Sequence, residues 1–584
     1  MCLHRTLSLF ALVAVAALSS GEIRYTVTPM PDEGKLLVSM SFIAPAGAFE
    51  VQMPNWSPGA YMLRDMGRSV SEFHAMDSSG NTLTVEHASD NSWSANLEHA
   101  ARVFIAYTVP NRISEGAMHY SGPPTYMYLV GRKEEACRLR LDTPRGWKIA
   151  IGLDAIGDSY FDYTAPDYDV LADNPVTMGD FIELRYTSHG KPITIAMRGA
   201  PRNNVDRKRI LRVCKEITDG QGDFFGGLPF SKFIWHFNVT PGQDGGGGLE
   251  HLSSTQISLA QGIGPRSIRV LAHEFFHLWN VKRIRSRVLG PFDYTELPET
   301  GALYWLEGVT DYYASLLTYR FGTLDQSAFL GDLVSNISNV RNNAARLEVS
   351  PYESSMRVGE TNNGRGNSNG YQISYYNYGW VTGLVLDIEM RDRTNGERSL
   401  DDVMLALWEI CKDDKPGFVE EEIRRQYVRF GGSDDFFDDV VMNPGQLPLE
   451  EQLARVGYQL TADQVPYVDN GFDARPGFGS GSVTVRRVSD SAASAGLKVG
   501  DVVLEINGES VQGTDRRDTM GKVRAALSEA KAGTAIRLKV RRDGEEHEIS
   551  VVPVEAFRSV WKIEDVANGD EEKLALRKGW ITGG

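Results

Sequence analysis

The stretch LAHEFFHLWNV places two histidines, His273 and His277, four residues apart in a segment with helical hydrophobic spacing. Residues i and i+4 lie on one helix face, so both imidazoles can reach a single metal ion. Glu274 points about 100° away around the helix, which suits a base that acts on water better than it suits a ligand. The alternative is a core helix with two satisfied histidines. With 11 histidines in 584 residues, a chance match is roughly a one-in-a-hundred event.

The third ligand decides which kind of metal site this is. Asn280 and Arg283 stand where a longer HExxHxxGxxH motif would have its glycine and third histidine, so that class is excluded. The alternative is a downstream glutamate. Glu307 lies in the strongly helical segment LYWLEGVTDYYASLLTYRFG, whereas Glu296 and Glu299 lie in a turn region with Pro and Gly. We predict Glu307 as the third ligand, which leaves the fourth zinc position for water and makes the site catalytic.

Asp311 follows Glu307 by four residues and therefore lies on the same helix face. Carboxylates near metal sites commonly accept a hydrogen bond from a ligand histidine and fix its tautomer. We predict that role for Asp311. The alternative for Glu307 is a solvent-facing carboxylate on an ordinary helix. The predicted cofactor is one Zn²⁺ per chain.

The hydrophobic pattern predicts a multidomain α+β protein. Residues 21–200 alternate polar and apolar side chains between Pro, Gly, Asn and Asp turns, which indicates an N-terminal antiparallel β domain. Residues 201–468 have mainly helical spacing, with Ser267 expected to cap the helix of the HExxH motif. Residues 469–560 form a further unit, and residues 561–584 are expected to be a C-terminal tail.

The N-terminus predicts export. Residues 1–20 contain a short basic start, an apolar run from Leu7 to Leu18 and the small residues of a cleavage site, as in a signal peptide. The alternative is a buried N-terminal helix. We expect a periplasmic or secreted protein. No later segment reaches about 18 consecutive apolar residues, so we expect no membrane span in the mature chain.

Net charge indicates which partners are disfavoured, and the cysteine count limits the number of disulfides. A formal net charge of −16 disfavours nucleic acid, because phosphate binding requires concentrated Lys and Arg. Beyond the signal peptide the chain has three cysteines, Cys137, Cys214 and Cys411, far apart in sequence. They allow one disulfide but no disulfide framework.

Three stretches together resemble the glycyl aminopeptidase family of gluzincin zinc metallopeptidases. They are GGGGLEHLSS, the pair HEFFHLWNVKRIR and WLEGVTDYY, and PNWSPGAYMLRDMGRSVSEF at residues 54–73. The resemblance covers nearly the whole mature chain and implies a β domain, a thermolysin-like catalytic domain and a PDZ domain. Between His277 and Glu307 lie 29 residues, more than thermolysin-like enzymes have. We expect the insert SRVLGPFDYTELPETG to line the substrate cleft.

The resemblance also assigns groups that would bind substrate. Glu250 matches the glutamate that holds the substrate α-amine in exopeptidases of this clan. Gly247 and Gly248, in the glycine run before it, let the backbone approach a ligand closely, although such a run is equally compatible with a floppy turn. His251 is left unassigned, and a structural role and a substrate-contacting role are equally compatible with the sequence.

An oxyanion donor is expected in ISYYNYGW, residues 373–380. Related aminopeptidases have Tyr-x-Lys-Gly here, and alignment on Gly379 makes Tyr376 the donor. Tyr378 replaces the usual lysine, so the match is partial and Tyr375 remains a rival. The alternative is a cluster of packing tyrosines.

The C-terminal unit resembles a PDZ domain through GSVTVRRVSDSAASAGLKVGDVVLEINGESV, residues 481–511. PGFG, at residues 476–479, would be its carboxylate-binding loop, where a peptide C-terminus binds. A PDZ domain that only packs against the catalytic domain is equally compatible with the sequence.

The leading hypothesis is therefore a zinc metallo-aminopeptidase that acts on peptides with a free N-terminus, in which Glu274 activates water. The family resemblance implies a preference for N-terminal Gly or Ala. The alternatives are a thermolysin-like zinc endopeptidase, and a PDZ adaptor with a vestigial peptidase domain. Intact His273, Glu274, His277 and Glu307 argue against the vestigial case.

Overall fold

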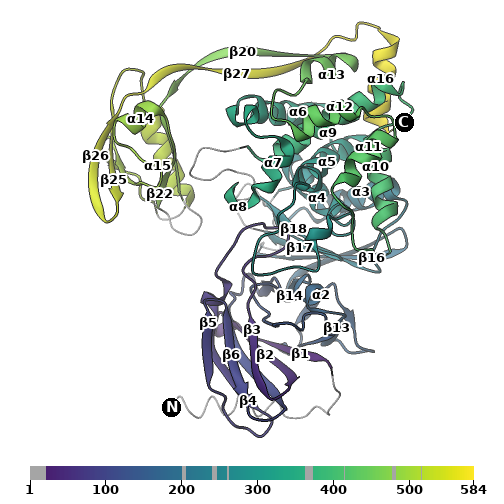
Figure 1. Ribbon diagram of the computed structural model, residues 1–584, viewed down its shortest axis with the longest axis vertical. Helices are drawn as coiled ribbons and strands as arrows, with labels where there is room; N and C mark the ends of the chain where they lie inside the picture. The colour runs from purple at the N-terminus through teal and green to yellow at the C-terminus, as the bar shows by residue number, and fades with distance from the viewer. Residues whose placement is uncertain are drawn as a thin grey trace. The chain divides into compact units, whose positions relative to one another are not determined.

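The computed structural model describes residues 21–199, 205–239, 246–259, 262–361, 373–413, 415–476, 482–513 and 516–583. The chain forms two compact units, drawn in Figure 1. The first comprises residues 1–282 and 288–298, and the second comprises residues 283–287 and 299–584. The predicted signal peptide, residues 1–20, lies outside the described residues. Within the described ranges, no helix is long and apolar enough to cross a membrane.

The first unit begins with a β domain built on two sheets. The larger has the order β12-β13-β10-β1-β2-β7-β4, with β1 (Ile23–Met30), β2 (Lys35–Ala44), β4 (Ser71–Asp77), β7 (Ala101–Pro110), β10 (Cys137–Leu141), β12 (Asp154–Ala155) and β13 (Asp162–Ala165). The smaller has the order β5-β6-β3-β9, with β3 (Gly47–Gln52), β5 (Val85–Ser89), β6 (Ser92–Leu97) and β9 (Tyr128–Leu129).

Alternation of side chains explains this β domain. In β1 every second residue is buried, and the same holds in β2, so each strand has one apolar face. Val27, Val38, Val51 and Leu97, from both sheets, lie in one hydrophobic core. The strand pairs of both sheets are antiparallel apart from β1 and β10, which pair in parallel. The predicted antiparallel β domain is confirmed.

A five-stranded sheet follows, in the order β15-β16-β17-β19-β18. Its strands are β15 (Ile182–Ser188), β16 (Lys191–Arg198), β17 (Phe233–Val239), β18 (Gly248–Glu250) and β19 (Ser254–Leu259). β16 pairs with β17 in parallel, so this sheet joins strands from both sides of the boundary expected at residue 200. A smaller sheet has the order β11-β14-β8, with β8 (Ala117–Tyr120), β11 (Lys148–Ile151) and β14 (Val176–Gly179).

Two helices lie on this five-stranded sheet, α3 (Arg207–Phe225) and α4 (Pro265–Phe276), and α4 carries the HExxH motif. Phe275 of α4 packs on Phe233 and Trp235 of β17, with ring centroids 5.1 and 5.2 Å apart. The expected cap at Ser267 is wrong, because α4 begins two residues earlier with Pro265 in its first turn and Gly264 as the N-cap residue. Proline's fixed φ suits that first position, so the helix starts before the serine.

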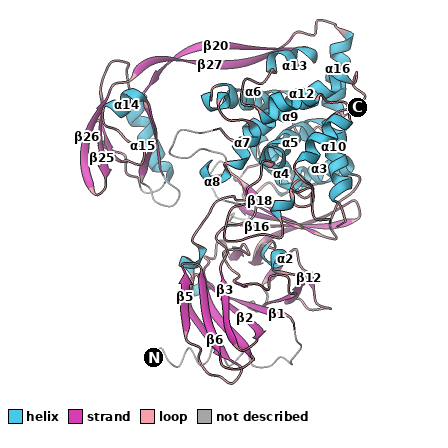
Figure 2. Cartoon of the chain, viewed as in Figure 1, coloured by secondary structure: helices cyan, strands magenta, loops and turns pink. Residues whose placement is uncertain are grey.

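The second unit is mainly helical, as Figure 2 shows. Its helices are η4 (Tyr304–Val309), α5 (Thr310–Arg320), α6 (Gln326–Arg341), α7 (Pro351–Met356), α8 (Val358–Thr361), α9 (Tyr375–Arg393), α10 (Leu400–Cys411), α11 (Glu421–Arg429), α12 (Asp434–Phe437), η6 (Asp438–Met442) and α13 (Leu449–Arg455). Helix α9 is buried on nearly all sides, which is typical of a helix at the centre of a bundle. The predicted mainly helical peptidase domain is thus confirmed.

A long two-stranded ribbon carries the C-terminal domain. β20 (Tyr458–Asp469) and β27 (Val554–Asp565) pair along twelve residues each, and everything between them belongs to the PDZ domain. That domain has strands β21 (Phe472–Pro476), β22 (Val483–Val488), β23 (Val502–Ile506), β24 (Glu509–Ser510), β25 (Ile536–Arg542) and β26 (Glu545–Val551), and helices α14 (Asp490–Ser494) and α15 (Arg516–Ser528). Of the predicted PGFG loop, residues 477–479 lie outside the described residues.

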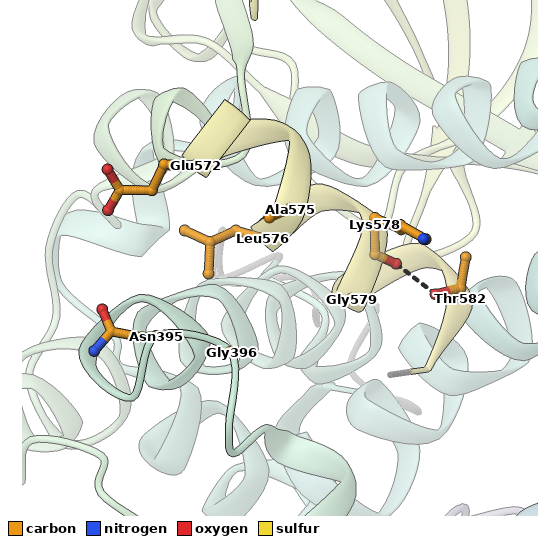
Figure 3. A pocket seen from close by; sticks show the side chains of 8 residues that line it. All are labelled: Asn395, Gly396, Glu572, Ala575, Leu576, Lys578, Gly579 and Thr582. Carbon is orange, nitrogen blue, oxygen red and sulfur yellow. Dashed lines mark hydrogen bonds between the residues drawn. The ribbon is translucent and has the colours of Figure 1, made fainter. Parts of the chain in front are cut away.

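The segment expected to be a tail is structured. After β27 the chain forms α16 (Glu571–Thr582), whose Trp580 is fully buried. The Trp580 indole donates a hydrogen bond to the Tyr312 hydroxyl of α5 at 2.8 Å, and Arg320 donates to the Trp580 carbonyl. Helix α16 also lines a pocket together with Asn395 and Gly396, drawn in Figure 3. The PDZ domain is therefore inserted into the helical unit rather than appended to its end.

The three described cysteines, Cys137, Cys214 and Cys411, are all buried and free. Burial raises the pKa of each thiol, so they remain protonated and act as small apolar side chains.

Candidate metal centre

His273 of α4 and His277, the C-cap residue of that helix, face each other. His273 and His277 are 8% and 1% exposed, and their Nε2 atoms lie 2.8 Å apart with the rings nearly perpendicular. The Nδ1–H of His277 donates a hydrogen bond to the backbone carbonyl of Asn280 at 2.6 Å. That bond fixes the tautomer, because the proton resides on Nδ1 and the lone pair on Nε2 is left for a metal.

The backbone carbonyl of Asn280 thus performs for His277 the role that the sequence analysis expected of Asp311. Asp311 lies in the first turn of α5 and is partly exposed. Its predicted hydrogen bond to a ligand histidine stays a prediction for His273.

Helix α4 is held rigidly on its other side. Phe275 and Phe276 are fully buried, and Gln221 of α3 donates to the Ala272 carbonyl at 2.8 Å. Anchoring one face by packing leaves the opposite face, with His273 and Glu274, aimed away from the aromatic core. A rigid helix is the kind of support that holds ligand geometry within narrow limits.

Glu250 and Glu274 meet although 23 residues separate them. Carboxylate and imidazole atoms of Glu250, Glu274 and His277 all lie within 4.8 Å of one another, and all three side chains are buried. Two buried carboxylates this close repel each other unless a cation or a proton lies between them. The arrangement therefore favours a cationic ligand beside Glu274.

Strand β18 places Glu250. Among the described residues it is the edge strand of the five-stranded sheet and pairs with β19, where Glu250 lies opposite Thr255. Gly248 of this strand packs directly on the Glu274 side chain, since an added Cβ would lie 2.5 Å from Cγ and 2.6 Å from Cδ of Glu274. Gly248 is thus required for close approach to Glu274. A Cβ on Gly247 would meet nothing within 4 Å, but its φ of +80° favours glycine.

Glu307 lies in η4, one turn of π-helix that runs into α5. Glu307 is 1% exposed. One potential ligand atom from each of Glu307, His273 and His277 lies within 4.8 Å of the other two. Its sequence rivals Glu296 and Glu299 are both exposed. π-helical turns are rare and often occur at functional sites, because they re-aim one side chain within a helix.

Helix α9 packs against η4 at two glycines. A Cβ on Gly308 would lie 2.6 Å from the Tyr375 carbonyl oxygen and would overlap the backbone of Gly379. Gly379 therefore lies where the two helices cross, and a side chain there would clash with the backbone of η4. This explains why glycine occupies the position used to align the tyrosine motif. The crossing also places the first turn of α9, with Tyr375 and Tyr376, next to the helix of Glu307.

The tyrosines of that turn differ in exposure. Tyr375 is fully buried, whereas Tyr376 is partly exposed, and the two rings stack with centroids 4.9 Å apart. Tyr378 points elsewhere: it is buried, its hydroxyl donates to the Arg346 carbonyl at 3.4 Å, and burial raises its pKa to about 12. Partial exposure favours Tyr376 over Tyr375 as a group that can meet a ligand.

Family models match three stretches of the chain. They are the Peptidase M61 N-terminal domain over residues 24–180, the M61 glycyl aminopeptidase over residues 266–382 and a PDZ domain over residues 457–552. The chain belongs to the M61 glycyl aminopeptidase family. The M61 match over residues 266–382 contains His273, His277, Glu307 and Tyr376, so the predicted family and its domain order are confirmed.

One solved structure shares the fold of this M61 peptidase. An aminopeptidase N family protein from Idiomarina loihiensis aligns with a TM-score of 0.79 at 24% identity, over 96% of this chain and 100% of that one. An M1 zinc metallopeptidase from Deinococcus radiodurans aligns with a TM-score of only 0.46 at 12% identity, over 75% of this chain and 96% of that one. The second likeness is too distant to support an argument. No curated protein matches the chain.

One buried cluster of this M61 protein, around Asp173, was not predicted from the sequence. The Asp173 carboxylate accepts hydrogen bonds from His251 Nδ1 at 3.1 Å, Leu252 N at 2.7 Å and Lys282 Nζ at 2.7 Å. Burial opposes ionisation of Asp173, but Lys282 and His251 hold its pKa below the usual value. The cluster gives His251 a structural role, because it ties the strand of Glu250 to the segment after His277. Nothing in the sequence near Asp173 indicates this contact.

Proposed function

We propose that this M61 peptidase is a zinc aminopeptidase that removes N-terminal residues from peptides. One observation carries the proposal: the Glu250 carboxylate lies within 4.8 Å of Glu274 and His277. A substrate ammonium bound at Glu250 would place the first peptide bond, and no later one, beside the hydrolytic group. A carboxylate is the natural partner for that cation, since a buried ammonium without one is strongly penalised.

His273, His277 and Glu307 would hold the zinc ion. The two Nε2 atoms aimed at each other, the tautomer fixed by the Asn280 carbonyl and the buried third carboxylate fit the N₂O donor set of catalytic zinc sites. Zinc, when bound, lowers the pKa of water and polarises a carbonyl group.

The other groups of the chain handle protons and orientation. Glu274 accepts the proton of the attacking water at its carboxylate and passes it to the leaving amine. Tyr376 donates a hydrogen bond to the oxygen on which negative charge develops. Within the part of the chain that the structure describes, β18 pairs along one side, so an extended peptide could pair with its backbone along the other.

We also propose a substrate preference, a location and a ligand for the PDZ domain. A preference for N-terminal Gly or Ala follows from family likeness. A periplasmic or secreted location follows from residues 1–20. The PDZ domain would bind a peptide C-terminus in the groove typical of its fold.

The test is an assay of the purified protein against matched free and N-acetylated peptides, with metal analysis alongside. We expect stoichiometric zinc, release of N-terminal residues from free peptides, and no cleavage of the acetylated ones. Glu250→Ala should lose on the order of 2–5 kcal/mol of transition-state binding towards free-amine substrates only. Internal cleavage of an acetylated peptide would replace the proposal with an endopeptidase, and a metal-free inactive protein would replace it with an adaptor.

A further inference from the structure

A loop of the β domain reaches the carboxylate of Glu250. The loop follows β3 and contains Gly59, part of the motif PNWSPGAYML that the site described above leaves without a role. A Cβ added to Gly59 would lie 2.5 Å from Glu250 Oε1, 2.6 Å from Oε2 and 2.6 Å from Leu249 Cδ1. Carbon and oxygen atoms at ordinary contact lie about 3.5 Å apart, so no side chain fits between this loop and Glu250.

The backbone at this point also requires glycine. Gly59 has φ +87°, in the left-handed region, and Tyr61 close by has φ 43°. Such conformations cost energy for residues other than glycine and persist where surrounding contacts hold them. The close approach and the left-handed conformation thus coincide at one residue.

The insert that follows the HExxH helix holds the loop in place. The Trp56 indole donates to the Asp293 carbonyl at 2.8 Å, and the Asn55 backbone N–H donates to the Tyr294 carbonyl at 2.8 Å. The Asn55 amide donates to the Thr295 carbonyl at 3.1 Å. Three hydrogen bonds therefore join residues 55 and 56 to residues 293–295.

That insert is itself anchored in the β domain. The Phe292 N–H donates to Asp169 at 3.1 Å, and Lys133 donates to the Phe292 carbonyl. Tyr294 is 2% exposed and packs on Tyr128 and Tyr168. Residues 288–298 of the insert therefore belong to the same compact unit as the β domain, although they follow the metal helix in sequence.

We propose that residues 54–61, braced by residues 292–295, form the closed end of the substrate-amine site, with Gly59 as its specificity-determining residue. The inference rests on the proposed function, because it takes Glu250 as the group that binds the ammonium. A peptide that extended beyond its amine at Glu250 would have to occupy the space of this loop. The closed end thereby excludes blocked and internal sequences and confines binding to free N-termini.

The first experiment compares Gly59→Ala with Gly80→Ala in the full-length zinc enzyme. Gly80 is a matched control, since it lies in the same domain with φ +84° and a Cβ there would meet nothing within 4 Å. Both changes carry a similar backbone cost, but only Gly59→Ala displaces the Glu250 carboxylate. We expect Gly59→Ala to raise KM for free peptides about tenfold or more at unchanged zinc content, and Gly80→Ala to match the parent enzyme.

A double-mutant cycle shows whether the effect acts through Glu250. In the Glu250→Ala background the carboxylate is absent, so adding Gly59→Ala should change kcat/KM by less than about twofold. Additive losses would overturn the inference, because they would mean that Gly59 acts elsewhere. Equal behaviour of Gly59→Ala and Gly80→Ala would overturn it too.

A second variant tests the brace and leaves both Gly59 and Glu250 unchanged. Trp56→Phe keeps an aromatic ring but loses the hydrogen bond to the Asp293 carbonyl, and should raise KM for free peptides by roughly fivefold at unchanged kcat, as for one hydrogen bond. An unchanged KM would exclude the brace. Failure of the proposed function looks different: the parent enzyme itself would then cleave acetylated and free peptides alike.

Discussion

The C-terminal helix, rather than the PDZ domain, should decide whether the catalytic unit folds. Two shortened variants separate these parts. The first ends after Asp469 and lacks both the PDZ domain and α16. The second removes only residues 470–553 and joins Asp469 to Val554 through an Asn-Gly turn. Asp469 and Val554 are paired in the ribbon, so a two-residue turn between them closes the ribbon without strain.

The contacts of α16 set the expected magnitude. Trp580 is fully buried, and replacing a buried Trp by Ala typically costs about 3–5 kcal/mol. Arg577 donates to the backbone carbonyls of Val456 at 2.7 Å and Gly457 at 2.6 Å, and pairs with Asp565. Each buried acceptor left without its donor costs about 1–3 kcal/mol more. The sum approaches the whole stability of a typical domain, about 5–15 kcal/mol.

Loss of α16 should also reach the metal site. Its Trp580 bonds to Tyr312 of α5, whose hydroxyl in turn donates to Asp387 of α9 at 2.6 Å. Helix α5 continues directly from the π-helical turn that carries Glu307. We therefore expect the variant that ends at Asp469 to be poorly folded and free of zinc.

Measurements of thermal unfolding, zinc content and peptide hydrolysis on both variants check this. The variant without residues 470–553 should keep zinc and turnover near those of the full chain. Trp580→Ala in the full chain should lower the free energy of unfolding by about 3–5 kcal/mol. If the chain that ends at Asp469 unfolds at the same temperature and holds as much zinc as the variant with the ribbon closed, the reasoning is refuted.

Three substitutions test the metal centre itself. Glu307→Ala should lose bound zinc, while Glu299→Ala keeps it; the reverse result would reassign the third ligand. Glu274→Gln should retain zinc yet lose nearly all turnover, because an amide cannot accept the proton of water, and substantial remaining turnover would contradict its role as the base. Tyr376→Phe should lower kcat by roughly 10²-fold with unchanged zinc. A larger defect from Tyr375→Phe would transfer the oxyanion role to that residue.

The sequence predicted the parts of this protein that depend on local spacing. A period of 3.6 residues predicted that His273 and His277 lie on one helix face and that Glu307 lies in a helix. A period of 2 predicted the alternation of buried side chains in β1 and β2. These patterns arise because a helix or a strand must bury one face, so they can be recognised without knowing the partner. The resemblance to the M61 family, carried by sequence motifs, implied the domain order.

Boundaries and packing roles were harder to predict. The boundary expected at residue 200 cuts a sheet, because β16 pairs with β17 only after the chain has passed through α3. The expected tail forms α16, whose sequence has only a weak amphipathic pattern. Its Trp580 and Arg577 are nevertheless buried, because segments distant in sequence pack against them. Short helices of this kind owe their stability to tertiary packing, which local propensity does not reveal.

Contacts between distant residues were decided by the tertiary structure alone. The sequence offered Glu250 and Glu274 as separate groups, and only the pairing of β18 beside α4 brings their carboxylates within 4.8 Å. Likewise, Gly59 meets Glu250 across 190 intervening residues, and the Asn280 carbonyl orients His277 where a carboxylate was expected. The physical reason is that a sequence pattern shows which face of a helix or strand is buried. Which atoms cover that face depends on how the whole chain folds.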